Sequence, residues 1–188
     1  MSEATLSKED RQALLEIARQ TLQQCALQGK LKGHLGEPTR EALRAPGGAF
    51  VSLHKRGELR GCIGTFQGEG LLCHTIESMA YAAGWEDPRF PHLEARELEQ
   101  VDIEISVLSP LRKITEVKEI EVGKHGICIS RGFRRGVLLP QVATEYGWDR
   151  ETFLEHTCLK AGLPPDAWKK GATIEIFSAQ VFGEKDAE

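Results

Sequence analysis

The residues best suited to chemistry lie in the segment Leu59-Arg60-Gly61-Cys62-Ile63-Gly64. Cys62 offers a thiol whose deprotonated form is a nucleophile, and a nearby guanidinium such as that of Arg60 favours this thiolate. In a strand the two side chains share a face, roughly 6–7 Å apart. Gly61 and Gly64 would let a ligand or another backbone approach closely. The alternative is that Cys62 fills space in the core, because free cysteine is among the most buried residue types.

Alternating polar and apolar residues place this segment in a β-hairpin that covers residues 49–66. A three-residue loop, Lys55-Arg56-Gly57, sets Leu53 opposite Leu59 and gives one apolar face. A two-residue loop would mix the two faces, so the pattern favours the longer loop. Leu59 and Ile63 are then expected to anchor the second strand in the core, with Arg60 and Cys62 on the other face.

The sequence does not identify a base for the Cys62 thiol. In the expected register His54 shares a face with Cys62 but lies about 13 Å away along the strand, too far for direct proton transfer. His74, His92 and His125 occur in other segments, and any of them could fold back onto the sulfur. A Cys–His dyad therefore requires an imidazole within hydrogen-bond reach of Cys62 in the folded protein.

Charged residues in two further segments could complete a site. Arg89 lies in the loop Asp87-Pro88-Arg89-Phe90-Pro91, which its prolines stiffen, and we expect it to orient an anionic group. Asp102 and Glu104 share the polar face of a strand predicted over residues 101–107. Such a face usually meets solvent or an arginine. If this strand neighbours the hairpin, Arg60 can pair with Glu104.

The spacing of histidines and cysteines predicts no metal site and no cofactor. The sequence has no CxxC, HxxxH or HExxH motif, and the adjacent Cys73 and His74 would point about 100° apart on a helix. Neither a Walker A nor a GxGxxG pattern occurs. Arg131, Arg134 and Arg135 with Phe133 could contact single-stranded RNA, but a solvated hairpin tip explains them more simply.

The remaining elements follow from periodicity and capping signals. Ser7, with Asp10 three residues on, predicts the start of a helix that ends at Gly29. Residues 30–47 form a long connection, a place where function often lies. Further helices are expected over residues 70–86, 141–146 and 149–160, a second hairpin over 126–139, and a last strand over 172–181. Residues 56–63 align without gaps onto 131–138, which suggests a duplicated hairpin–helix unit.

Composition limits the classes of protein to which this chain can belong. Its 188 residues, 40% hydrophobic and 28% charged, suit one globular domain or two small lobes. A net charge of −4 makes nucleic acid an unlikely partner, because that binding needs concentrated Lys and Arg. Five cysteines without paired spacing are typical of reduced thiols in the cytoplasm, and no apolar stretch is long enough to span a membrane.

Six segments together resemble the AMMECR family, whose prokaryotic branch is called AmmeMemoRadiSam system protein A. They cover nearly the whole chain in order and are residues 48–53, 59–64, 87–91, 103–108, 136–141 and 161–168. The resemblance implies one AMMECR domain over residues 1–188, with an α+β fold of largely antiparallel sheet and flanking helices in two packed lobes. It also implies a functional association with a Memo-like protein and a radical S-adenosylmethionine protein. The family's six-residue motif is matched from Leu59 to Gly64 and is its suspected functional site.

Two functions are compatible with these residues. In the first, the protein is enzyme-like: Cys62 is a nucleophile or ligand-sensing thiol, Arg60 its electrostatic partner, and Arg89 a residue that orients an anion of an unidentified small-molecule or protein ligand. In the second, it is a binding module without turnover that presents the segment 59–64 and the Arg89 loop to a protein partner. Thiol reactivity separates the two, because an enzyme-like thiol is alkylated fast at neutral pH.

Overall fold

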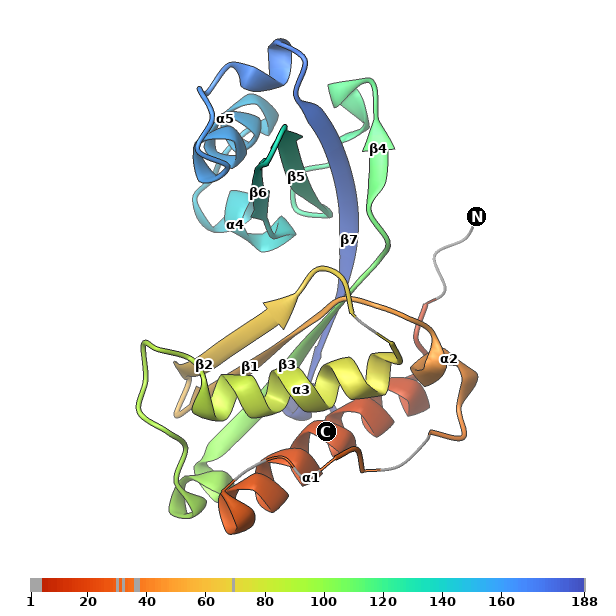
Figure 1. Ribbon diagram of the computed structural model, residues 1–188, viewed down its shortest axis with the longest axis vertical. Helices are drawn as coiled ribbons and strands as arrows, with labels where there is room; N and C mark the ends of the chain where they lie inside the picture. The colour runs from red at the N-terminus through yellow and green to blue at the C-terminus, as the bar shows by residue number, and fades with distance from the viewer. Residues whose placement is uncertain (1–4, 30, 32, 36–37, 69, 188) are drawn as a thin grey trace. The chain divides into compact units, whose positions relative to one another are not determined.

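The computed structural model describes residues 5–29, 31, 33–35, 38–68 and 70–187. The chain divides into two compact units, shown in Figure 1: Met1–Leu108 together with Gln180–Glu188, and Ser109–Ala179. Helices flank antiparallel strand pairs in both units. The predicted α+β fold is therefore confirmed. No helix in the described part of the chain is long and apolar enough to cross a membrane.

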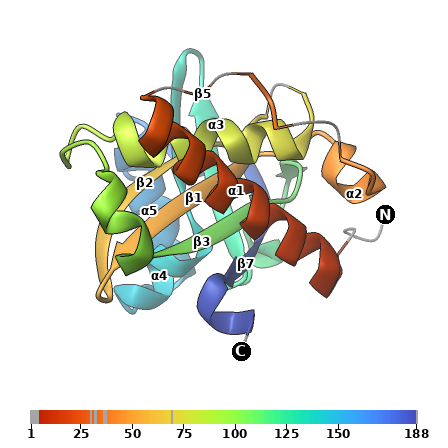
Figure 2. The ribbon, with the colours of Figure 1, turned by 90° about the horizontal axis from the view of Figure 1, so that it is seen from below.

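The first unit places two long helices against one face of an antiparallel sheet. The strand order is β2-β1-β3, followed by the C-terminal end of β7. Figure 2 shows α1 and α3 crossing one face of these strands. In chain order the elements are α1 (Lys8–Gln28), α2 (Glu41–Arg44), β1 (Ala49–Lys55), β2 (Glu58–Thr65), α3 (Leu72–Trp85), η1 (Ala95–Gln100), β3 (Val101–Leu108) and η4 (Glu184–Ala187).

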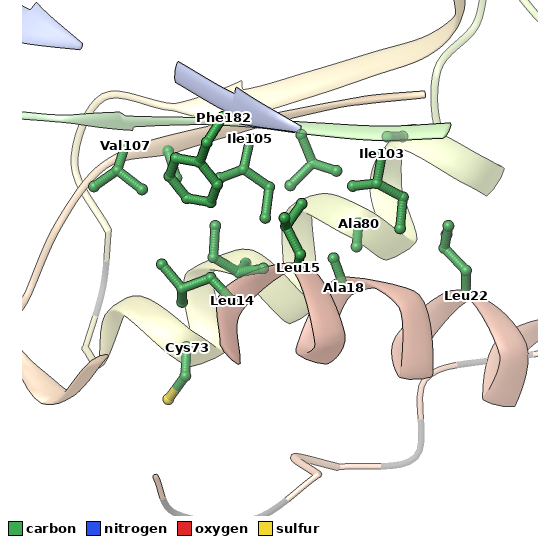
Figure 3. Packing of buried hydrophobic residues seen from close by; sticks show 14 of the residues in the cluster. Leu14, Leu15, Ala18, Leu22, Cys73, Ala80, Ile103, Ile105, Val107 and Phe182 are labelled. Atoms are coloured by element: carbon green, nitrogen blue, oxygen red, sulfur yellow. The ribbon is translucent and has the colours of Figure 1, made fainter. Parts of the chain in front are cut away.

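The first helix begins and ends where its capping residues predict. The Ser7 hydroxyl accepts the Asp10 N–H at 3.1 Å, and the Asp10 carboxylate accepts the Ser7 N–H at 3.0 Å. Gly29 ends the helix with a φ of 73°, which glycine adopts without steric cost. The buried side of the helix carries Leu14 and Leu22 toward the sheet (Figure 3). These contacts bury the apolar face that the helical periodicity predicts.

The hairpin is confirmed, but its predicted register is wrong. Its turn has two central residues, Arg56 and Gly57, both with positive φ (55° and 84°), as in a type I′ turn. A bulge then shifts the register, so that His54 pairs with Leu59 but Leu53 pairs with Gly61. The extra residue, Arg60, lets a short turn coexist with a continuous apolar face beyond it. Alternation alone cannot distinguish a two-residue turn followed by a bulge from a three-residue loop, so the pattern predicts the longer loop.

The second unit is a smaller sheet with its own helices and core. Strand β7 (Thr173–Gly183) pairs with β4 (Arg112–Ile114) and with β5 (His125–Arg131), and β5 pairs with β6 (Arg134–Leu138). Helices α4 (Pro140–Glu145) and α5 (Arg150–Lys160) follow the hairpin as predicted, with η2 (Val117–Glu119) and η3 (Ala167–Lys169) in the connections. Phe153 of α5 is fully buried against this sheet's isoleucines.

A glycine of each hairpin lies against the backbone of a later helix. A Cβ at Gly61 would lie 2.1 Å from the Ala83 carbonyl oxygen in α3, and one at Gly136 would lie 2.3 Å from the nitrogen of Ala161, the C-cap of α5. Each unit therefore contains the hairpin–helix arrangement that the internal repeat predicts. The second hairpin, however, turns at Gly132 (φ 61°) and shows no bulge in its register. Duplication of the unit stays a prediction.

Candidate functional site

Cys62 lies on the sheet face opposite the helices, in a row of polar side chains. It pairs with Ser52 of β1, which in turn pairs with Glu104 of β3. The Ser52 hydroxyl donates to the Cys62 sulfur at 3.1 Å. Cys62 is partly exposed, whereas the other four cysteines are buried. The row thus brings a thiol, a hydroxyl and a carboxylate together on one face.

Two side chains of the loop after α3 bind the backbone of Cys62 at the outer edge of β2. Asp87 accepts the Cys62 backbone N–H at 2.9 Å, and Arg89 donates to the Cys62 carbonyl oxygen at 3.3 Å. Arg89 also donates through Nε (3.0 Å) and Nη2 (2.7 Å) to the two oxygens of Asp87. The Asp87–Arg89 pair therefore takes the position that a neighbouring strand would occupy.

The local sequence explains how this pair is held. Pro88 follows Asp87 in a tight turn closed by the Phe90 N–H on the Asp87 carbonyl at 3.2 Å, and Asp87 Oδ1 accepts the Arg89 N–H at 3.1 Å. Arg89 and then the Cys62 N–H hold the pKa of Asp87 well below its ordinary value, against the effect of burial. Asp87 in turn raises the pKa of Arg89, against the effect of burial. Arg89 is thus a cation that interacts with Cys62.

Arg60 has a different set of partners. It donates to Glu97 through Nε (3.1 Å) and Nη2 (2.9 Å), to the Pro91 carbonyl at 3.0 Å and to the His92 carbonyl at 3.3 Å. Arg60 and then Lys55 lower the pKa of Glu97 to about 2, although burial opposes the shift. These residues line a cavity of about 240 Å³. Arg60 fastens the bulge of β2 to the segment before β3.

The bulge changes the relationships expected around Arg60. Because it interrupts the alternation, Arg60 turns to the loop and η1, and the expected face shared by Arg60 and Cys62 is wrong. The expected Arg60–Glu104 pair is wrong as well, since Glu97 takes that guanidinium. Leu59 is 41% exposed rather than anchored in the core, and Ile63 is half-buried on the helix face. A functional role for Arg60 stays a prediction.

No imidazole within the described residues hydrogen-bonds the Cys62 sulfur. The observed register does bring His54 nearer than expected: it lies on the same face of β1, two residues beyond Ser52. Diagonal neighbours about 7–8 Å apart are within reach of long side chains, but no hydrogen bond joins the His54 ring to the Cys62 sulfur within the described residues. The requirement set for a Cys–His dyad is therefore not met in this structure.

Three residues of this arrangement were missed as site residues by sequence reasoning, namely Ser52, Asp87 and Glu97. For Ser52 the signal was the hairpin alternation, but the wrong loop length set Ser52 opposite Arg60 instead of Cys62. For Asp87 it was the Asp-Pro-X-Phe turn, which predicts an aspartate with its carboxylate directed to nearby N–H groups. Glu97 gave no signal, because its contact with Arg60 spans 37 residues. Sequence spacing also missed the metal-ligand types His34, His74 and Glu77, which lie close together around α3.

Two arginines of the second hairpin form hydrogen bonds within their own unit. Arg134 donates to the Gly162 carbonyl, and Arg135 donates to the Cys128 sulfur at 3.1 Å. Phe133 at the tip is fully exposed. RNA contact by this tip and the solvated tip both stay predictions.

The fold and the β2 edge define an α+β protein of two units, with the six-residue segment 59–64 in an edge strand under a side-chain clamp. The AMMECR1 family model matches residues 15–182. The chain belongs to the AMMECR1 family.

Relatives extend over almost the whole chain. A protein of Methanothermobacter thermautotrophicus is 41% identical over 192 residues, covering 98% of this chain and 99% of that protein. A protein of Methanosarcina barkeri is 41% identical over 93% of this chain and 90% of its own length. The crystal structure of uncharacterized protein PH0010 from Pyrococcus horikoshii has a TM-score of 0.80 at 35% identity, covering 92% of this chain and 90% of that one. It confirms the fold.

Proposed function

We propose that this protein is a binding module that recognises an extended, acidic segment of a partner protein along the edge of β2. The observation that carries the proposal is the clamp of Asp87 and Arg89 on the Cys62 peptide group. It occupies one outward-facing backbone position of an edge strand and so fixes where an added strand can begin.

The next position along the edge has the geometry that an added strand needs. Because the Cys62 N–H and C=O point off the edge, alternation in an antiparallel pair directs the N–H and C=O of Gly64 off the same edge. A Cβ at Gly64 would lie 2.2 Å from the Phe50 ring, so glycine is needed here by packing. Phe66 packs edge-on to that ring at 5.1 Å and is half-buried. A peptide bonded to Gly64 would lie beside these aromatic side chains.

The charge of Arg89 indicates the chemistry of the partner. Its side chain is 56% exposed although it holds Asp87, and in the described chain its Nη1 has no hydrogen-bond partner. An exposed guanidinium beside an open strand edge favours a carboxylate on the bound segment. The Memo-like and radical S-adenosylmethionine proteins implied by the family resemblance are the proposed partners, in the cytoplasm.

Hydrogen exchange on the complex tests this proposal. The full chain is titrated with each purified partner, and amide exchange is compared with and without it. We expect protection of the Gly64 amide and a roughly tenfold or greater loss of affinity for Arg89→Gln. Arg112→Gln is the matched control, because Arg112 is 58% exposed, about as much as Arg89, and pairs with Glu119 in the second unit. Binding that leaves the Gly64 amide unprotected, or that both variants weaken equally, would contradict the proposal.

A sensing thiol at Cys62 is the second candidate, favoured by the exposure and the contacts of this residue. Cys62 is partly exposed among buried cysteines, its sulfur accepts the Ser52 hydroxyl, and Arg89 donates to its carbonyl oxygen. A partly exposed thiol with a polar neighbour is accessible to a reagent or a ligand. In a folded Cys62→Ser protein, unchanged activity of the partner system would rule this function out.

A further inference from the structure

A separate group of metal-ligand types lies on α3 and the connection before β1. One ring nitrogen each of His34 and His74 and one carboxylate oxygen of Glu77 lie within 4.8 Å of one another. His74 and Glu77 are three residues apart on α3 and so lie on one helix face. His34 comes from a different segment, so the group exists only in the folded chain.

Glu77 is the buried centre of this group. Its side chain is 1% exposed, and it accepts hydrogen bonds from His34 Nδ1 at 2.5 Å and from the Leu35 N–H at 2.8 Å. A buried carboxylate needs such partners because burial removes its hydration. Glu77 therefore binds both His34 and Leu35 to α3.

His74 leaves one ring nitrogen without a hydrogen bond. Its Nε2 is buried and has no partner within the described chain, while its ring stacks on that of His34 with centroids 3.5 Å apart and planes 13° apart. Buried polar atoms are rarely left in this condition. An imidazole nitrogen with a free lone pair is also the form of histidine that binds metals.

We propose that His34, His74 and Glu77 bind a divalent transition-metal ion of the zinc class. Two imidazole nitrogens and one carboxylate oxygen form a recognised three-ligand set for such ions, with the remaining position left to water. The His34 side chain is 49% exposed, which gives an ion and its water access from solvent. This site is independent of the β2 edge and of the function proposed for it.

Binding requires a defined local change. Ligand atoms of a tetrahedral zinc site lie about 3.3 Å apart, so the donor atoms must draw together and the two rings must leave their parallel stack. If His34 Nδ1 becomes a ligand, its hydrogen bond to Glu77 is given up and any proton on Nδ1 passes to Nε2 or to solvent.

Zinc titration of chelator-treated full-length protein tests the site. We expect one Zn²⁺ per chain, with affinity lowered roughly tenfold or more by His34→Ala, His74→Ala and Glu77→Gln. His92→Ala, an exposed histidine elsewhere, and Cys73→Ser, the buried thiol next to His74, should leave affinity unchanged. Bound Co²⁺ should show the absorption of a nitrogen–oxygen site without a thiolate charge-transfer band.

Thermal unfolding keeps the test valid for variants with altered stability. Zn²⁺ is expected to raise the Tm of the natural protein and of His92→Ala but not that of His74→Ala. Absence of one-to-one binding, equal binding by the cluster variants, or loss of binding in Cys73→Ser would overturn the proposal.

Discussion

The Asp87 carboxylate accepts the backbone N–H of Cys62 at 2.9 Å, across 25 residues of sequence. A side chain thus satisfies a backbone donor that a further strand would otherwise bind. The contact joins the loop after α3 to the segment 59–64 and leaves the sulfur on a different face of the strand. It explains how an edge strand can be capped at one residue and open at the next.

Replacing Asp87 should destabilise the fold. The Asp87 side chain is 2% exposed, and Asp87→Ala leaves the Cys62 N–H without its acceptor. We therefore expect the free energy of unfolding to fall by about 1–3 kcal/mol. Glu121→Ala is the control, because that carboxylate is 61% exposed in a surface pair with Lys124, and its change should stay within about 0.5 kcal/mol. Denaturant unfolding measures both, and equal effects would contradict the role given to Asp87.

The Arg60–Glu97 pair predicts a specific acid sensitivity. The folded-state pKa of Glu97 is lowered to about 2 from an ordinary 4.5, so its stabilising contribution is complete above pH 4.5 and is lost as the pH falls toward 2. Glu97 is 13% exposed, and the contribution is on the order of 3 kcal/mol. Across this window the free energy of unfolding should therefore fall more steeply with decreasing pH for the natural protein than for Glu97→Gln. An equal dependence of the unfolding free energy on pH in both proteins would show that the ion pair does not stabilise the fold.

Gly61 and Gly84 form a matched pair for testing close packing. Gly61→Ala places a methyl group 2.1 Å from the Ala83 carbonyl, and we expect a loss of about 3 kcal/mol or more because backbone must move. At Gly84, inside α3, the nearest atom to a Cβ is 3.5 Å away. Gly84→Ala should be neutral or stabilising by up to about 1 kcal/mol, because alanine favours helix. Thermal unfolding distinguishes the two, and similar Tm values would refute the contact.

Alkylation of the native protein should modify Cys62 first. A soluble reagent is expected to label one cysteine per chain before the four buried thiols react. Ser52→Ala should slow the labelling because the hydroxyl that donates to the sulfur is removed. Peptide mapping by mass spectrometry identifies the labelled site, with Cys62→Ser as the control. Equally fast labelling of Cys158 or Cys25 would contradict the assignment.

Local signals in the sequence were sufficient for much of the fold. The Ser7 and Gly29 caps bracket α1, and the helix predicted over residues 70–86 is α3 (Leu72–Trp85). The strand predicted over 101–107 is β3 (Val101–Leu108). The short elements α2 and β4 were not predicted, because four and three residues carry too little periodicity. Elements whose buried face repeats over several turns or pleats are the ones that sequence reveals.

The sequence by itself determined the α+β class, the position of segment 59–64 on a strand and the family resemblance, because periodicity, turn residues and motifs are local. Tertiary structure alone decided which groups meet Cys62. The bulge at Arg60 directs that arginine to Glu97. Asp87 and Arg89, from the loop after α3, bind the backbone of Cys62. Segment 59–64 therefore keeps its place as a candidate site, with Arg89 replacing Arg60 as the cation beside it. Contacts between distant segments depend on register and packing, which residue spacing does not encode.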